Sequence, residues 1–140
     1  MDNAILFLFA SVLLIGVGLL VIIALTKRSP QLLDKAQYQQ QWLSIQQSVK
    51  NDPASMQFAI MQADKLLDKA LMQRGFAGET MGERLKTACE GKKISDTRGV
   101  WIAHKLRNRI AHEHDVSVNR TATVKALQNF KRALHDLGAL

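Results

Sequence analysis

Intramolecular disulfide bonds are excluded in this chain, because its 140 residues include a single cysteine, Cys89. The disulfide framework that stabilises many small secreted domains is therefore absent, and a lone thiol is consistent with a reducing compartment. Proline is also scarce. Its two residues, Pro30 and Pro53, each follow a residue of a helix-capping type. Both are expected to begin helices.

Signals of β-structure are missing as well. No stretch alternates apolar and polar residues over the length of a strand, and the hairpin turns Asn-Gly and Asp-Gly do not occur. Internal repeats are absent, and the short glutamine run at 39–41 is the sole low-complexity tract. These absences favour an all-helical protein.

Charge is absent from Ala4 to Leu25, a run of 22 apolar or small residues interrupted by Ser11. As a helix this run would measure about 33 Å, which is enough to cross the hydrocarbon core of a membrane. A cleaved signal peptide is the alternative, but it requires a basic start and a shorter apolar stretch. Because the chain starts Met-Asp-Asn and the run is long, we predict a transmembrane anchor.

Basic residues are distributed unequally around this run. Lys27 and Arg28 follow it directly, and no Lys or Arg precedes it. The positive-inside rule then predicts a single-pass protein of the inner or plasma membrane, with its N-terminus outside and its C-terminal domain in the cytoplasm. We divide the chain into an anchor with a basic flank, 1–28, and a domain, 29–140.

The formal net charge is +7, and the part that begins at Lys27 carries 19 basic and 11 acidic side chains, a net charge of +8. Such an excess favours anionic partners, either RNA or the anionic inner leaflet of the membrane. Ordinary solubility charge on a domain beside a membrane is the alternative.

Three helices are expected in the first part of the domain. One begins at Ser29-Pro30 and runs to about Lys50, with Tyr38, Trp42, Ile45 and Val49 on one face. The second begins at Asp52-Pro53 and ends at Arg74-Gly75. Its apolar stripe comprises Met56, Ala59, Ile60, Ala63, Leu66, Leu67, Ala70 and Leu71. The third extends from a capping box at 80–83 to about Glu90.

Two further helices complete the domain. A fourth is expected from a cap at Ser95 or Asp96 to about Glu113, with a core side of Ile102, Ala103, Leu106 and Ile110. The last follows a polar loop at 115–119 and has a stripe of Val124, Leu127, Phe130, Leu134 and Leu137. The predicted fold is therefore all-α, an N-terminal transmembrane helix followed by a four- to five-helix bundle.

The fourth helix also carries most of the polar residues that indicate chemistry. His104, Asn108 and His112 are spaced by four and share one face, which we expect to lie opposite the core side. Arg107 flanks this row, and Lys105 and Arg109 add positive charge. Histidine can take and give a proton near neutral pH, and arginine offers a planar fork that fits phosphate oxygens.

The segment Leu106-Arg107-Asn108-Arg109-Ile110-Ala111-His112-Glu113 resembles the signature of the HEPN superfamily, an arginine followed closely by a histidine, often with a polar residue after the arginine. That superfamily consists of four- or five-helix bundles with the motif on a late helix. Many members are metal-independent ribonucleases that work as dimers around a shared cleft. The resemblance covers residues 31–137 loosely and is close at 106–113.

The resemblance implies a role for each motif residue. His112 would be the general acid or base, Arg107 would stabilise charge on the scissile phosphate, and Asn108 would orient one of them. His104, Lys105 and Arg109 are candidate nucleic-acid contacts. The resemblance implies metal-independent endoribonuclease activity with no cofactor. The implied partners are RNA and either a second copy of the chain or a small protein.

Other interpretations remain open. The bundle could be a non-enzymatic module for protein interaction or dimerisation, or its basic face could bind the membrane surface. Within the motif, His112 could cap a helix end, and Arg107 could pair with Glu113 or Asp115. Histidines 104 and 114 fit surface or supporting positions, and Trp101 fits the core or a base-stacking platform. A zinc site from Cys89, His112 and His114 matches no common structural zinc motif, so no metal site is predicted.

Overall fold

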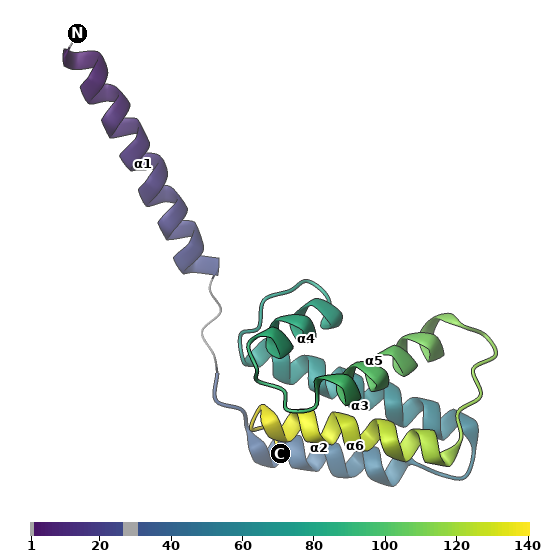
Figure 1. The fold of residues 1–140 in the computed structure, drawn as a ribbon. Helices are drawn as coiled ribbons and strands as arrows, with labels where there is room; N and C mark the ends of the chain where they lie inside the picture. The colour runs from purple at the N-terminus through teal and green to yellow at the C-terminus, as the bar shows by residue number, and fades with distance from the viewer. Residues whose placement is uncertain (1, 27–30) are drawn as a thin grey trace.

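The computed structural model describes residues 2–26 and 31–140 and contains six helices within them. They are α1 (Asp2–Thr26), α2 (Lys35–Ser48), α3 (Pro53–Gln73), α4 (Met81–Glu90), α5 (Thr97–His112) and α6 (Arg120–Asp136). No strand occurs in these two ranges. The all-α prediction is confirmed, with one apolar helix followed by a five-helix bundle (Figure 1).

Helix α1 contains the apolar run. Its segment Ile5–Ile23 is long and apolar enough to cross a membrane, and none of it is buried against the rest of the protein. A helix of these 19 residues measures about 28 Å, close to the thickness of a hydrocarbon core. The predicted basic flank, Lys27-Arg28, and the predicted helix start, Ser29-Pro30, lie outside the described residues.

Helix α3 is the central element of the bundle, because it packs against α2, α4, α5 and α6. Every member of its predicted apolar stripe is buried. The face predicted for α2 is also confirmed, since Tyr38, Trp42 and Ile45 are buried and Val49 packs against the core. The core therefore surrounds α3, and α4 and α5 cover one side of it (Figure 1).

The start of α2 differs from the prediction. The helix begins at Lys35, and Asp34 caps it by accepting a hydrogen bond from the backbone N–H of Gln37 at 3.1 Å. Residues 31–34 are not helical. Instead, the backbone N–H of Gln31 donates to the carbonyl of Gln73 at 2.8 Å. This bond fixes the beginning of the domain against the end of α3.

The other helix starts follow their predicted capping chemistry. Asp52 and Asp96 accept hydrogen bonds from backbone N–H groups of α3 and α5. At α4 the capping box is complete, since Thr80 and Glu83 bond to each other's backbone N–H. The carboxylate of Glu83 also accepts from the N–H of Glu79, and these backbone bonds hold the pKa of Glu83 below its ordinary value.

Two predicted core positions are wrong. Ile102 is 47% exposed, and Val124 is also exposed. Helix α5 packs against both α3 and α6, so its buried side is rotated toward Val100, Ala103 and His104. On α6, Thr123 is buried where Val124 was expected, and its hydroxyl donates to the carbonyl of Asn119 at 2.9 Å. That bond satisfies the buried hydroxyl of Thr123, which the apolar period of α6 would place on the solvent side.

The phenol of Tyr38 provides a test of core integrity, because this is the chain's single tyrosine. It is fully buried and donates to the side-chain oxygen of Gln73 at 2.8 Å. Burial raises its pKa from an ordinary value near 10 to about 12. The fold therefore stabilises the neutral phenol. This contribution is complete below pH 10 and is lost as the pH rises toward 12.

We expect the ultraviolet absorbance of tyrosinate to appear near pH 12 in the folded protein and near pH 10 in the chain unfolded by urea. A Gln73→Ala variant serves as a control, since it removes the hydrogen bond and leaves the ring covered. A folded protein that titrates near pH 10 would show that Tyr38 is accessible to water.

Candidate functional site

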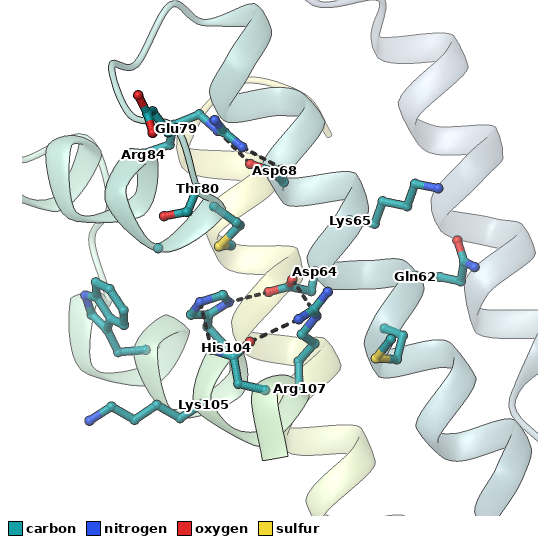
Figure 2. A pocket seen from close by; sticks show the side chains of 15 residues that line it. Gln62, Asp64, Lys65, Asp68, Glu79, Thr80, Arg84, His104, Lys105 and Arg107 are labelled. Atoms are coloured by element: carbon teal, nitrogen blue, oxygen red, sulfur yellow. Dashed lines mark hydrogen bonds and ion pairs between the residues drawn. The ribbon is translucent and has the colours of Figure 1, made fainter. Parts of the chain in front are cut away.

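A cleft of about 870 Å³ lies between the beginning of α4 and the middle of α5, over one side of α3. Both α4 and α5 pack on α3, and the cleft is the space left between them (Figure 2). The side chains that line it come from three segments. They are Met61, Gln62, Asp64, Lys65 and Asp68 from α3, then Glu79, Thr80, Met81, Gly82 and Arg84, then Trp101, His104, Lys105, Arg107 and Asn108 from α5.

Four of these side chains form a closed ring, which we call the Asp64 ring: Asp64, His104, Arg107 and Asn108. The carboxylate of Asp64 lies 2.7 Å from Nδ1 of His104 and 3.2 Å from Nε of Arg107. Nη1 of Arg107 donates to Oδ1 of Asn108 at 3.1 Å, and Nδ2 of Asn108 lies 3.2 Å from Nε2 of His104. Figure 2 shows His104 and Arg107 approaching Asp64 from α5.

The ring fixes the proton on His104. A guanidinium can only donate, so the atom of Asn108 that faces Arg107 is its carbonyl oxygen. The amide nitrogen of Asn108 must then donate to Nε2 of His104. Nε2 accepts, which leaves Nδ1 to carry the hydrogen and donate it to Asp64. The network therefore assigns a ring hydrogen of His104 to Nδ1.

Arg107 is held from one side and open on the other. Its Nε atom is buried and forms an ion pair with Asp64, but the N–H is not aimed at the oxygen, and it donates to no acceptor among the described residues. About one third of the side chain remains exposed, and it lines the cleft. Its N–H groups other than those used by the ring are available to an anion there.

A second arginine neutralises the next carboxylate along α3. Arg84 donates from Nε and Nη2 to the two oxygens of Asp68, at 2.7 and 2.9 Å, and from Nη1 to the carbonyl of Gly78 at 2.8 Å. Asp64 and Asp68 are one helical turn apart, and each is paired with an arginine. In the described part of the chain, Lys65 and Lys105 are the cleft cations with no ion pair. Figure 2 places them on either side of the Asp64 ring.

The predicted site residues divide into two groups. Arg107, Asn108, His104 and Lys105 line the cleft. Arg109 and His112 do not belong to its lining; both are exposed, and Arg109 forms an ion pair with Glu113 at 3.3 Å. The alternative that Arg107 pairs with Glu113 or Asp115 is wrong, because its carboxylate partner is Asp64.

The helix face expected for His104 is wrong, whereas the supporting position, the other expectation, agrees with its bonds to Asp64 and Asn108. The residue is 6% exposed, so it is neither a surface residue nor on a face opposite the core. Its ring contacts Trp101 edge to face, with 5.8 Å between centroids. His104 can be buried because it pairs with Asp64, and that hydrogen bond compensates the cost of burying both polar groups. His104 can act on a ligand only through the part of its edge that reaches the cleft.

Sequence reasoning missed Asp64, Asp68 and Arg84. A signal existed for Asp64, which lies four residues after Ile60 and three before Leu67, inside the apolar stripe of α3. A carboxylate at a core position must be paired, and that pairing predicts a basic partner on a neighbouring helix. Nothing in the spacing identifies which basic residue it is.

Two glycines beside the cleft allow a matched test. Gly78 has a φ of 149°, and a Cβ there would lie 2.7 Å from the backbone nitrogen of Arg84. We expect Gly78→Ala to lower the free energy of unfolding by about 1–3 kcal/mol. Gly82→Ala is the control, because its Cβ would meet Nε2 of His104 at an ordinary 3.5 Å and alanine favours helix by about 0.5–1 kcal/mol. Equal melting temperatures for the two variants would contradict this account.

Comparison with known proteins assigns no relative. No protein-family model matches the chain, and no match is found among the curated proteins or among the solved structures. Within residues 2–26 and 31–140, no group of three His, Cys, Asp or Glu side chains is placed to hold a metal ion. The site is therefore defined by its own geometry: a cleft lined by four lysine and arginine side chains and three carboxylates, whose floor carries a buried aspartate, histidine and arginine network.

Proposed function

We propose that this protein is a membrane-anchored, HEPN-like domain that binds RNA in the cleft on the cytoplasmic side of an inner or plasma membrane. The anchor is α1, and the orientation follows from Lys27 and Arg28 behind it and from the absence of basic residues before it. The observation that carries the proposal is the position of Arg107 and Asn108, the first two residues of the motif, in an open cleft.

The electrostatics of the cleft support a polyanionic ligand. The two carboxylates on its floor are already neutralised by Arg84 and Arg107, so they do not repel a phosphate as free carboxylates would. Lys65 and Lys105 supply charge at its sides. A guanidinium that is oriented in advance loses little conformational freedom when it binds a phosphate.

Cleavage of the bound RNA extends this proposal to His112. The 2′-oxygen of a ribose attacks the adjacent phosphorus, the bond to the 5′-oxygen breaks, and a cyclic phosphate and a free hydroxyl result. One proton leaves the 2′-hydroxyl and one reaches the 5′-oxygen, a transfer that histidine can perform. His112 lies at the exposed end of α5, one turn beyond Asn108. The resemblance implies that a second copy would complete such a site.

Binding of a fluorescent single-stranded RNA to the full chain in detergent micelles tests the proposal. We expect Lys65→Gln/Lys105→Gln to weaken binding and to lower the slope of log affinity against log salt by about 0.7 for each lost phosphate contact. Arg107→Gln should weaken it further. The control is Lys50→Gln/Lys125→Gln, which removes the same charge from exposed positions that do not line the cleft. No binding by the wild type, or equal losses in both double variants, would overturn the proposal.

A protein-interaction module is the second candidate, and one observation favours it. A groove of about 650 Å³ runs between α2 and α3, and Phe58, which is 54% exposed, lies along it. Exposed aromatic side chains are common anchors of protein interfaces. Sedimentation of the full chain in micelles distinguishes the candidates, because Phe58→Ser should abolish a dimer or complex that Arg107→Gln leaves intact.

A further inference from the structure

The short connection after α1 limits how far one end of the bundle can lie from that helix. The chain covers five Cα–Cα steps between Thr26, the last residue of α1, and Gln31, which is hydrogen-bonded to Gln73. Five steps span at most about 18 Å. Whatever path the chain takes, Gln31 lies within that distance of the end of α1, and the end of α3 is one hydrogen bond beyond it.

Two other segments share this end of the bundle. Nη1 of Arg120, at the start of α6, donates to Asn51 at 2.6 Å, which places the start of α6 at the opposite end, beside the start of α3. Because α6 packs along α3, its last turn lies near Gln73. Ser95 in turn donates to Asp136 at 2.7 Å, so the loop after α4 also lies there (Figure 1).

The side chains at this end, which we call the tether end, are Leu32, Lys35, Arg74, Lys92 and Lys93. Leu32 is 96% exposed, the highest value for a large apolar side chain in the described part of the bundle. None of the four cations forms an ion pair within the described residues. The acids nearby are engaged elsewhere: Asp34 caps α2, Glu90 pairs with Lys86, and Asp136 accepts from Ser95.

We infer that the tether end lies on the lipid surface, with Leu32 in the interfacial region and the four cations against anionic headgroups. An exposed leucine is unfavourable in water, but it is stabilised beside acyl chains, and basic side chains are attracted to an anionic leaflet within a Debye length of about 8 Å. The short tether keeps these groups within reach. The inference rests on the proposed anchoring by α1, but it does not depend on RNA binding.

A lipid surface explains this combination better than a protein partner does. The apolar contribution is one side chain rather than a continuous patch, and the four unpaired cations outnumber the acids Asp34 and Asp136 beside them. Interfacial lipid contact needs no more than that, whereas a stable protein interface buries a larger apolar centre. The contact would fix the orientation of the bundle over the membrane.

Site-directed spin labelling of the full chain in nanodiscs tests the contact. Cys89→Ser provides the background, and single cysteines are introduced at Leu32, at Glu90 beside the two lysines, and at Ser117. Ser117 marks the opposite end, where the carbonyl of Val116 accepts from Gln57 near the start of α3. With one copy in each phosphatidylglycerol disc, we expect labels at 32 and 90 to be severalfold less accessible to a water-soluble nickel complex than the label at 117.

Charge reversal supplies the matched control. Lys92→Glu/Lys93→Glu should return the label at 90 to the accessibility of the label at 117, as should phosphatidylcholine discs. Lys50→Glu/Lys125→Glu should have no effect. Equal accessibility at 90 and 117 in phosphatidylglycerol discs would overturn the inference, and so would protection at 90 that requires two copies in each disc. Failure of the chain to insert into discs would instead refute the anchor itself.

Discussion

Replacing Asp64 with alanine is expected to lower the free energy of unfolding by about 3–5 kcal/mol. Asp64 is 3% exposed, accepts from His104 and forms an ion pair with Arg107, so its removal leaves a buried imidazole N–H without its acceptor and a partly buried guanidinium without its counter-ion. Groups left in that state pay their full desolvation cost. The measurement is equilibrium unfolding of the full chain in micelles, followed by the fluorescence of Trp42 and Trp101.

Glu113→Ala is the matched control for this prediction. It also removes a carboxylate that is paired with an arginine of α5, but both partners of that pair are more than half exposed. Exposed pairs contribute about 0.2–1 kcal/mol, so the control should lie in that range. A similar small loss in both variants would mean that the Asp64 ring is open to water and does not stabilise the bundle.

Replacing His112 with alanine is expected to reduce the rate constant of RNA cleavage by about 10²–10⁴-fold. The residue is the last of α5, it is exposed, and its side chain makes no hydrogen bond or ion pair in the described part of the chain. The variant should therefore fold and bind RNA as the wild type does. Cleavage of a labelled single-stranded RNA is measured in single-turnover conditions with a metal chelator present.

His114→Ala controls for the loss of an exposed histidine two positions away and should cleave at the wild-type rate. Two results would contradict the assignment. Equal rates for His112→Ala and the wild type would remove His112 from the chemistry. Loss of cleavage in His104→Gln alone, with RNA binding and unfolding unchanged, would transfer the proton step to the histidine inside the cleft.

The helices could be predicted because each combines a local cap with an apolar period. Thr80 and Glu83 define the start of α4 within four residues, and the stripe of α3 repeats over about four turns. The start of α2 could not be predicted in this way. Ser-Pro at 29–30 is an acceptable helix start, and Asp34 is a second possible cap. The bond between Gln31 and Gln73 favours the start after Asp34. That bond joins residues far apart in the sequence.

The candidate site was predictable in its motif and not in its supporting residues. Arg107 and Asn108 were identified from α5 alone. Asp64, the carboxylate partner of Arg107, lies at least 40 positions earlier in the sequence, and its pairing with His104 and Arg107 depends on how α5 rotates over α3. Periodicity indicates which side of a helix is apolar. It counts a histidine as polar, even where a buried carboxylate on a neighbouring helix pairs with it.

The short connection between Thr26 and Gln31 also changes how two copies of the chain would meet. With α1 in the membrane as proposed, Gln31 lies within about 18 Å of the end of that helix, so copies of the domain diffuse in two dimensions beside the bilayer. Their effective concentration is then set by the number of copies per area of membrane. A pairing contact too weak to form in dilute solution can be occupied there, so the density of the protein in the membrane becomes the quantity that controls its assembly.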